Sequence, residues 1–201
     1  MYKVFLFILL ALVFSNCKFV LKKVYGITQP KLEDDVSLNN FLRKLKIKDE
    51  PIYTFKNIDT LYKFYSKASI PEAFFFNQQG FFVDYRETPT SCNAGIKNFI
   101  ADLKNRSQDR LDTNKIIHNH TIRLVDKNKQ TVVFEQLPKT EFYVVMYWAK
   151  FIGKTNNKIL DWQKAIAEAR KKGLSITTIY VSCDYQKSWG IVKKDIPKFK
   201  Y

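Results

Sequence analysis

The chain has 201 residues and a formal net charge of +15, from 34 lysines and arginines against 19 aspartates and glutamates. This length allows one medium domain with a hydrophobic core, or at most two very small ones. The positive charge suggests nucleic-acid binding, but no recognition motif accompanies it and the lysines are spread singly along the chain. We therefore expect a solvated basic surface and no nucleic-acid partner.

The first 17 residues have the features of an export signal. A single lysine, Lys3, precedes an apolar run over residues 4–14, and a Ser-Asn-Cys trio ends at Cys17. The run is shorter than the roughly 20 apolar residues that a membrane-spanning helix needs. A signal peptide over residues 1–16 is therefore favoured over an uncleaved anchor. Export also means that the basic chain meets anionic lipid headgroups and envelope polymers instead of nucleic acid.

Apolar residues running into the sequence Phe14-Ser-Asn-Cys17 resemble a bacterial lipoprotein signal in the form common in Bacteroidetes. That resemblance implies cleavage before Cys17, acylation of this cysteine with palmitate, and a lipid anchor in the bacterial cell envelope. Phe14 and Asn16 depart from the leucine and the small residue of the pattern, so an ordinary secretory signal with a chance cysteine stays open. Lysines at positions 18, 22 and 23 replace the acidic residues of surface-exported members, so we expect a periplasm-facing protein.

Residues 17–35 lack hydrophobic periodicity and are predicted to be a tether, followed by a single domain over residues 36–201. The elements expected in the first half of this domain are a helix over 36–47, a strand over 52–55, a helix over 58–66, strands over 73–77 and 81–85, and a helix that begins at Asn93. Ser37 or Asp35 is expected to cap the first helix. The two aromatic strands are predicted to form a hairpin in which Gly80 supplies a positive φ.

The strongest pattern lies in the last third of the chain. The elements expected there are a hairpin of residues 122–125 and 131–134, a buried strand over 142–148, a helix from Asn156 or Asn157 to Gly173, and a strand over 174–181. The strand, helix, strand order with short links predicts a βαβ unit with parallel strands. We therefore expect an α/β fold.

The stretch from Thr121 to Ala149, a small hairpin and then a buried strand ending in Trp148-Ala149, resembles the opening of periplasmic thioredoxin-like proteins of the redoxin type. In that family a Cys-x-x-Cys site follows, and Ile152, Gly153, Lys154 and Thr155 stand at its positions. Both cysteines are absent, which excludes the standard dithiol chemistry there. The resemblance implies a thioredoxin-like central mixed sheet with flanking helices.

A second segment, Ser69-Ile70-Pro71-Glu72-Ala-Phe-Phe-Phe-Asn-Gln-Gln-Gly80, resembles the part of thioredoxins that carries the cis-proline. In the family this segment follows the βαβ unit, whereas here it precedes it. One hypothesis is a circularly permuted domain in which residues 70–105 complete the sheet begun by residues 121–182, with strands 73–77 and 174–181 as neighbours. The alternative is a domain with its own topology and only local similarities.

In the permuted arrangement, Pro71, Cys92 and Cys183 converge with residues 152–155 at one edge of the sheet. Cys92 precedes a helix, whose partial positive charge lowers the pKa of a thiol. A displaced catalytic pair of Cys92 and Cys183 is therefore one hypothesis. A structural disulfide and two small buried thiols that never meet are the alternatives.

Two further patterns predict no site. Gly153-Lys154-Thr155 is similar to the end of a phosphate-binding loop, but Trp148 stands where the first glycine of that motif is required. His118 and His120 place two imidazoles on one face of a predicted strand, yet no cysteine or carboxylate pair at metal spacing joins them. We expect neither a metal nor a cofactor.

The function that these observations favour is a redox-dead thioredoxin-like binding or assembly module of the envelope. The resemblance implies a binding face formed by Pro71, Trp148 and residues 152–155, where family members grip extended peptides. The expected partners are the membrane, through lipidated Cys17, and an envelope protein or extended peptide. A thiol-disulfide oxidoreductase using Cys92 and Cys183 is the first alternative, and attachment to anionic surfaces through charge alone is the second.

Overall fold

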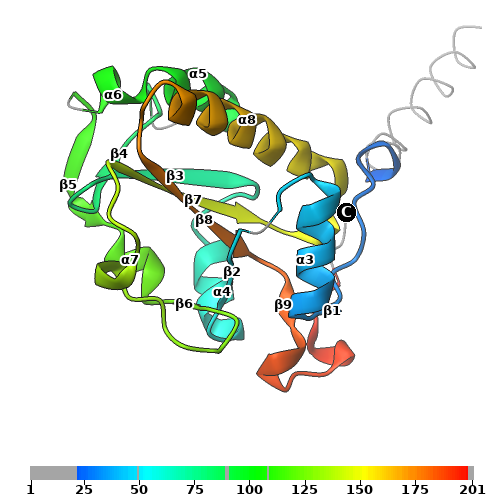
Figure 1. The fold of residues 1–201 in the computed structure, drawn as a ribbon. Coiled ribbons are helices and arrows are strands. Elements are labelled where there is room, and N and C mark those ends of the chain that lie inside the picture. The colour runs from blue at the N-terminus through cyan, green and yellow to red at the C-terminus, as the bar shows by residue number, and fades with distance from the viewer. Residues whose placement is uncertain (1–21, 49, 89–90, 108, 199–201) are drawn as a thin grey trace, which may run out of the picture.

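The computed structural model describes residues 22–48, 50–88, 91–107 and 109–198. The predicted signal peptide and the predicted lipidation at Cys17 lie outside these residues. The described chain forms a seven-stranded mixed sheet with helices on both faces, which confirms the α/β class (Figure 1). The order of strands in this sheet is β5-β4-β3-β7-β8-β2-β6. Their bounds are β5 Leu111–Ile116, β4 Phe81–Val83, β3 Glu72–Asn77, β7 Phe142–Trp148, β8 Ile176–Ser182, β2 Ile52–Phe55 and β6 Leu124–Val125.

Strand β7 is the centre of the sheet, and all of its residues are buried. It pairs in parallel with β8, from Phe142 opposite Ile176 to Trp148 opposite Ser182. Helix α8, Asn157–Lys171, connects the two strands. The predicted βαβ unit is therefore confirmed. Its strands are continuous apolar runs because both of their faces are buried.

The two faces of β7 contact different helices. Residues 142, 144, 146 and 148 pack into one hydrophobic cluster with α8, with α3, Asp35–Lys44, and with α5, Ile96–Ala101. Residues 143, 145 and 147 pack into a second cluster with α4, Ile58–Tyr65. Since successive side chains of a strand point to opposite faces, this one strand supports both cores.

The early aromatic hairpin joins the same sheet as the late βαβ unit. Strand β3 pairs antiparallel with β7, from Glu72 opposite Tyr147 to Asn77 opposite Phe142, and β4 pairs with β3. Gly80 has a φ of 83°, as the turn requires. The expectation that strands 73–77 and 174–181 are direct neighbours is wrong, because β7 lies between them.

The first two helices agree with their predicted ranges, but their caps differ in detail. Asp34, one residue before the expected Asp35, caps α3 by accepting the backbone N–H of Ser37 at 2.9 Å. Asn57 and Thr60 form a capping box at α4. The predicted third helix divides into a 3₁₀ turn at Asn93–Gly95, then α5 and the short α6, Leu103–Arg106.

The structure differs from the expectation between residues 109 and 137. Strand β5 is polar and partly exposed, so no hydrophobic pattern indicated it. The expected hairpin is reduced to β6 and a single bridge between Val125 and Thr131, because residues 134–136 turn into a 3₁₀ helix. His118 belongs to a short helix, α7, His118–Thr121, where a strand was expected.

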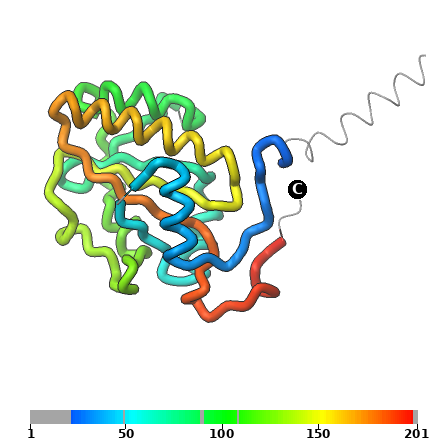
Figure 2. The backbone as a smooth tube through the Cα atoms, turned by 45° about the vertical axis from the view of Figure 1, so that its right-hand side comes forward, coloured from blue at the N-terminus to red at the C-terminus, as the bar shows by residue number. Residues whose placement is uncertain are grey.

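The segment 22–35, expected to belong to a tether, packs against the domain. Its strand β1, Leu32–Glu33, pairs in parallel with β9, Tyr185–Gln186. Figure 2 places this blue segment and the red C-terminal part of the described chain on the same side of the molecule. Pro30 and Glu33 are buried there, so this part of the chain contributes to the folded structure.

Candidate functional site

An open groove of about 620 Å³ lies at the edge of the sheet where β3 begins and β7 ends. Because these strands are antiparallel, the residue before β3 and the turn after β7 reach this edge together. Pro71, Cys92 and Thr155 all line the groove. Three residues that the sequence predicted to converge are therefore brought together.

Asn93 connects the segments that form this groove. Its side-chain nitrogen Nδ2 donates to the carbonyl oxygen of Pro71 at 2.8 Å, and its oxygen Oδ1 accepts from Nζ of Lys158 at 2.8 Å. Lys158 lies in the first turn of α8. The Ile70–Pro71 peptide bond is cis, as the resemblance implies. One amide side chain thus holds the loop after Cys92 against both β3 and α8.

A buried carboxylate lies beside Pro71. Glu72 accepts the hydroxyl of Tyr85 at 2.9 Å and pairs with Arg86 at 2.7 Å, and its side chain is only 6% exposed. Burial and the neighbouring Glu72 carboxylate raise the pKa of Tyr85. The ion pair with Arg86 compensates the charge of the Glu72 carboxylate, whose ionised form burial alone would destabilise. Sequence analysis missed both partners, although a glutamate opening an otherwise apolar strand was a usable signal.

The two described cysteines have different environments, and neither forms a disulfide with another described residue. Cys92 is exposed in the groove, whereas Cys183 is completely buried in the second cluster of the core. Burial raises the pKa of the Cys183 thiol well above its usual value, and the nearby Asp184 carboxylate adds to this effect. The Cys183 side chain is therefore held as a thiol, the unreactive form. The displaced redox pair stays a prediction that this arrangement does not favour.

The turn 148–155 contributes only part of its length to an accessible face. Trp148 has no exposed surface and stacks on Phe41, and Ile152 is 8% exposed. Lys154 is exposed and Thr155 is half-buried in the groove. Of this turn, Thr155 contributes to the accessible surface of the groove, while Trp148 packs in the core beneath it.

Residues 25–28 cover the outer side of this turn. The backbone N–H of Thr28 donates to the carbonyl oxygen of Phe151 at 2.8 Å. Gly153 has φ 58° and ψ −130°, and a Cβ atom built on it would lie 2.2 Å from the carbonyl oxygen of Tyr25. Only glycine permits both this backbone conformation and this close approach. The N-terminal segment therefore covers Gly153, which does not line the groove of Pro71 and Thr155.

Asp184 anchors the same turn from inside the protein. Its carboxylate accepts the backbone N–H of Lys150 and the hydroxyl of Ser182, and it is almost fully buried. Burial raises the pKa of Asp184 to about 7, although the hydrogen bonds from Lys150 and Ser182 oppose the shift. The ammonium group of Lys150 pairs with Glu33 of β1. Sequence analysis missed Asp184, because nothing in its sequence neighbourhood indicates burial of a charge.

The two histidines do not form a metal site. They lie on the short helix α7, so the expectation of one strand face is wrong. Nδ1 of His120 is 2.8 Å from the hydroxyl of Tyr147, and burial lowers the pKa of His120 to about 4, with a smaller effect from Arg123. Among the described residues, no group of three or more histidine, cysteine, aspartate or glutamate side chains is placed to hold a metal ion.

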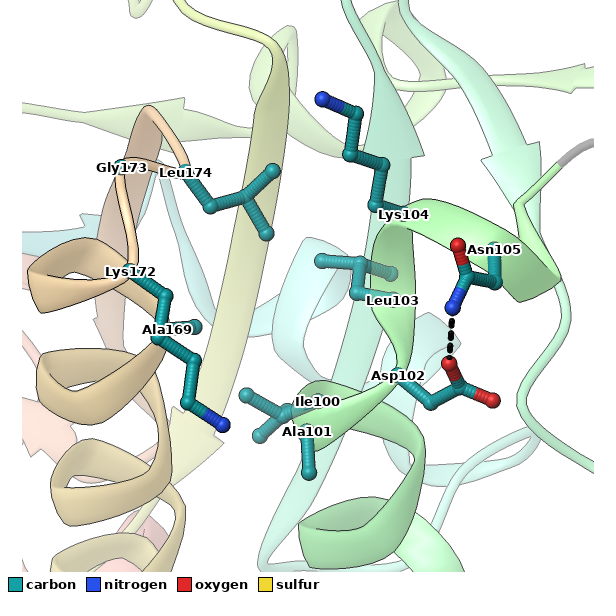
Figure 3. Close-up of a pocket in the computed structure, with 10 residues that line it drawn as sticks. All are labelled: Ile100, Ala101, Asp102, Leu103, Lys104, Asn105, Ala169, Lys172, Gly173 and Leu174. Atoms are coloured by element: carbon teal, nitrogen blue, oxygen red, sulfur yellow. Dashed lines mark hydrogen bonds between the residues drawn. The ribbon is translucent and has the colours of Figure 1, made fainter.

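A second hollow, of about 240 Å³, lies between the end of α8 and the junction of α5 with α6 (Figure 3). Ala169, Lys172 and Leu174 line one wall, and Ile100, Leu103 and Lys104 line the other. Its polar groups are solvated lysines and the Asp102–Asn105 hydrogen bond of 2.7 Å. None of the residues expected to act lies there, and the hollow offers no convergent chemistry.

Comparison of the chain with protein families, with curated proteins and with solved structures found no match. The function must therefore be argued from the groove itself. Within the described part of the chain, no helix combines the length and the apolar character that crossing a membrane requires.

Proposed function

We propose that this chain is an envelope lipoprotein whose thioredoxin-like domain binds an extended segment of a partner without thiol chemistry. The observation that carries the proposal is the shared groove of Pro71, Cys92 and Thr155. Ser69 and Ile70 line the same groove, and their backbone lies outside the regular strands. Extended peptides bind through main-chain hydrogen bonds, and backbone groups outside the regular strands are the ones that can make them.

The arrangement of the strands supports the thioredoxin-like interpretation. The hairpin β3–β4 lies on the side of β7 opposite β8, so residues 70–105 and residues 121–182 share one mixed sheet. Ile152 and Thr155 stand where the family has its cysteines, and Cys183 is buried. These placements support a peptide-binding face without a dithiol, and they favour binding over disulfide exchange.

Binding to a permanently unfolded protein tests this function. The probe is fluorescently labelled, reduced and carboxymethylated lactalbumin, and the full chain is kept in detergent micelles. Thr155→Trp fills the groove and is expected to weaken binding about 10-fold, since a groove that loses its volume loses its contacts. Cys92→Ser keeps the shape of the groove and is expected to bind as the unchanged chain does.

The same samples distinguish the enzymatic alternative. Reduction of insulin by the chain, lost in Cys92→Ser, would replace the binding proposal with the oxidoreductase. Equal binding by Thr155→Trp and the unchanged chain would also refute the proposed groove. If the only binding observed were retention on anionic liposomes, and salt abolished it, surface charge alone would explain the binding activity of the protein.

The lipid anchor is tested separately. Metabolic labelling with palmitate is expected to mark the unchanged chain and not Cys17→Ser, because acylation at the new N-terminus needs this thiol. Fractionation of the cells is then expected to find Cys17→Ser outside the membrane pellet. Labelling that persists in Cys17→Ser would contradict the proposed anchor and leave the groove proposal untouched.

A further inference from the structure

A small aromatic pocket adjoins the proposed peptide groove. Its volume is about 200 Å³, and it shares Phe74, Asp84 and Arg86 with the groove, so the two hollows are adjacent. Phe82 and His120 complete its aromatic lining, with the ring centroids of Phe74 and His120 4.8 Å apart. A cavity of about 150 Å³ already holds a benzene ring. The pocket is therefore large enough for one aromatic side chain.

The hydrogen bond of His120 gives this pocket a polar donor. Tyr147 is fully buried, and the only acceptor that the described residues offer its hydroxyl proton is Nδ1 of His120. With the hydroxyl as donor, the neutral ring carries its proton on Nε2. His120 lines the pocket, and its Nε2 has no hydrogen-bond partner among the described residues. An aromatic ring that presents its face or a hydroxyl oxygen satisfies such a donor.

Cations surround both hollows. Lys67 and Lys158 line the groove. Lys115, which pairs with Asp112 at 2.9 Å, lines the pocket with its ammonium 5.3 Å from the centroid of the Phe82 ring. The anionic lining is Glu72 and Asp84, and Glu72 is already paired with Arg86. The charge left for a partner is positive, so acidic residues of a partner are favoured.

We propose that this pocket is a specificity pocket of the groove, and that it receives an aromatic side chain flanked by acidic residues in an extended partner segment. This inference rests on the proposed function, since the groove holds the backbone of the same segment. Extended segments gain affinity from main-chain hydrogen bonds and specificity from pockets that take single side chains. A ring buried in such a pocket is the type of contact that dominates binding energy.

Fluorescence anisotropy with short labelled peptides tests the inference, using the full chain in micelles. The probes are hexapeptides with phenylalanine, tyrosine, leucine or alanine at the third position and a glutamate, or a lysine, on each side of it. The glutamate-flanked aromatic peptides are expected to bind about 10-fold more tightly than the alanine peptide. The lysine-flanked peptides are expected to bind more weakly than their glutamate counterparts, by a factor that falls as salt is added.

Lys115→Glu reverses a charge at the pocket and is expected to weaken the glutamate-flanked aromatic peptides about 5-fold. Lys104→Glu is the matched control, an exposed lysine beside the separate hollow of Figure 3, and is expected to have no effect. An equal loss in both variants would indicate nonspecific charge and overturn the pocket.

The outcomes separate this inference from the proposed function. If the aromatic and alanine peptides bind equally, and Thr155→Trp still weakens their binding, the proposed aromatic pocket is refuted and the proposed groove is retained. Peptides that do not bind at all, together with lactalbumin that does not bind, would overturn both. Since the peptide series needs no variant, the test holds even if Lys115→Glu fails to fold.

Discussion

The backbone N–H of Lys150 donates to both carboxylate oxygens of Asp184, at 3.0 and 2.9 Å. This contact joins Asp184, the second residue after β8, to the turn after β7, and the two positions are neighbours at one edge of the sheet. The turn leads to Thr155, which lines the groove. A buried carboxylate therefore fixes the part of the chain on which the groove depends.

Asp184 is predicted to make the stability depend on pH. Its folded pKa of about 7 lies above the ordinary aspartate pKa of 3.8, so the folded chain binds more protons between these two values. The contribution of this group to stability is complete below about pH 4 and is lost as the pH rises to about 7. Asp184→Asn keeps an acceptor for Lys150 and is expected to raise the free energy of unfolding at pH 8 by up to about 4 kcal/mol.

Urea unfolding at pH 5 and pH 8 measures this effect. The unchanged chain is expected to lose stability between these values relative to Asp184→Asn. Parallel pH profiles for the two proteins would show that Asp184 does not ionise in this range. Glu168→Gln is a suitable control, because this exposed carboxylate pairs only with Lys171 on the surface of α8.

Gly153→Ala is predicted to release the N-terminal segment. The new Cβ atom would overlap the backbone of Tyr25 and Gly26, and alanine is strained at the φ of 58°. Limited trypsin digestion is expected to cleave the variant faster after Lys31, which follows the displaced segment. Gly95→Ala is the control, because nothing lies within 4 Å of its added Cβ. Equal cleavage rates would contradict the close packing of residues 25–28 on the turn.

The ion pair of Glu72 and Arg86 is predicted to be required for stability. Arg86→Met leaves the buried carboxylate without its partner and is expected to lower the free energy of unfolding by about 3 kcal/mol. Adding Glu72→Gln to this variant is expected to recover most of the loss. Arg106→Met breaks the exposed pair with Asp102 and is expected to change little. A similar loss in both single variants would refute the special role of the buried pair.

The two described cysteines are predicted to react differently with a maleimide. Cys92 is exposed and is expected to be labelled in the native protein, whereas Cys183 is expected to be labelled only after unfolding. Peptide mass spectrometry measures both sites, and Cys92→Ser identifies the remaining signal. A disulfide between them under oxidising conditions would revive the displaced redox pair.

The sequence predicted the parts of the fold that depend on local patterns. The continuous apolar runs of β7 and β8 and the aromatic hairpin with Gly80 are read directly from hydrophobic periodicity and turn chemistry. Strand β5 was missed because the residues of Leu111–Ile116 are mostly polar and show no alternation of apolar and polar side chains. This polar edge strand forms because it pairs with β4. The local sequence does not indicate such a pairing.

The candidate site was predicted only in part. Pro71, Cys92 and Thr155 meet as expected, because strand direction fixes which ends share an edge. The contacts of Asn93 with Pro71 and of Lys150 with Asp184 join residues 22 and 34 positions apart. Such contacts depend on how the sheet assembles, so spacing along the chain does not indicate them.

The most direct test of the central claim, that an extended segment binds in the groove of Pro71, is amide chemical-shift mapping of the full chain in micelles. The probe is the glutamate-flanked phenylalanine hexapeptide. The expected shift changes lie at Ile70, Cys92, Asn93 and Thr155, and they are lost in Thr155→Trp. Changes confined to the hollow between α5 and α8, or spread evenly over the surface lysines, would contradict the claim.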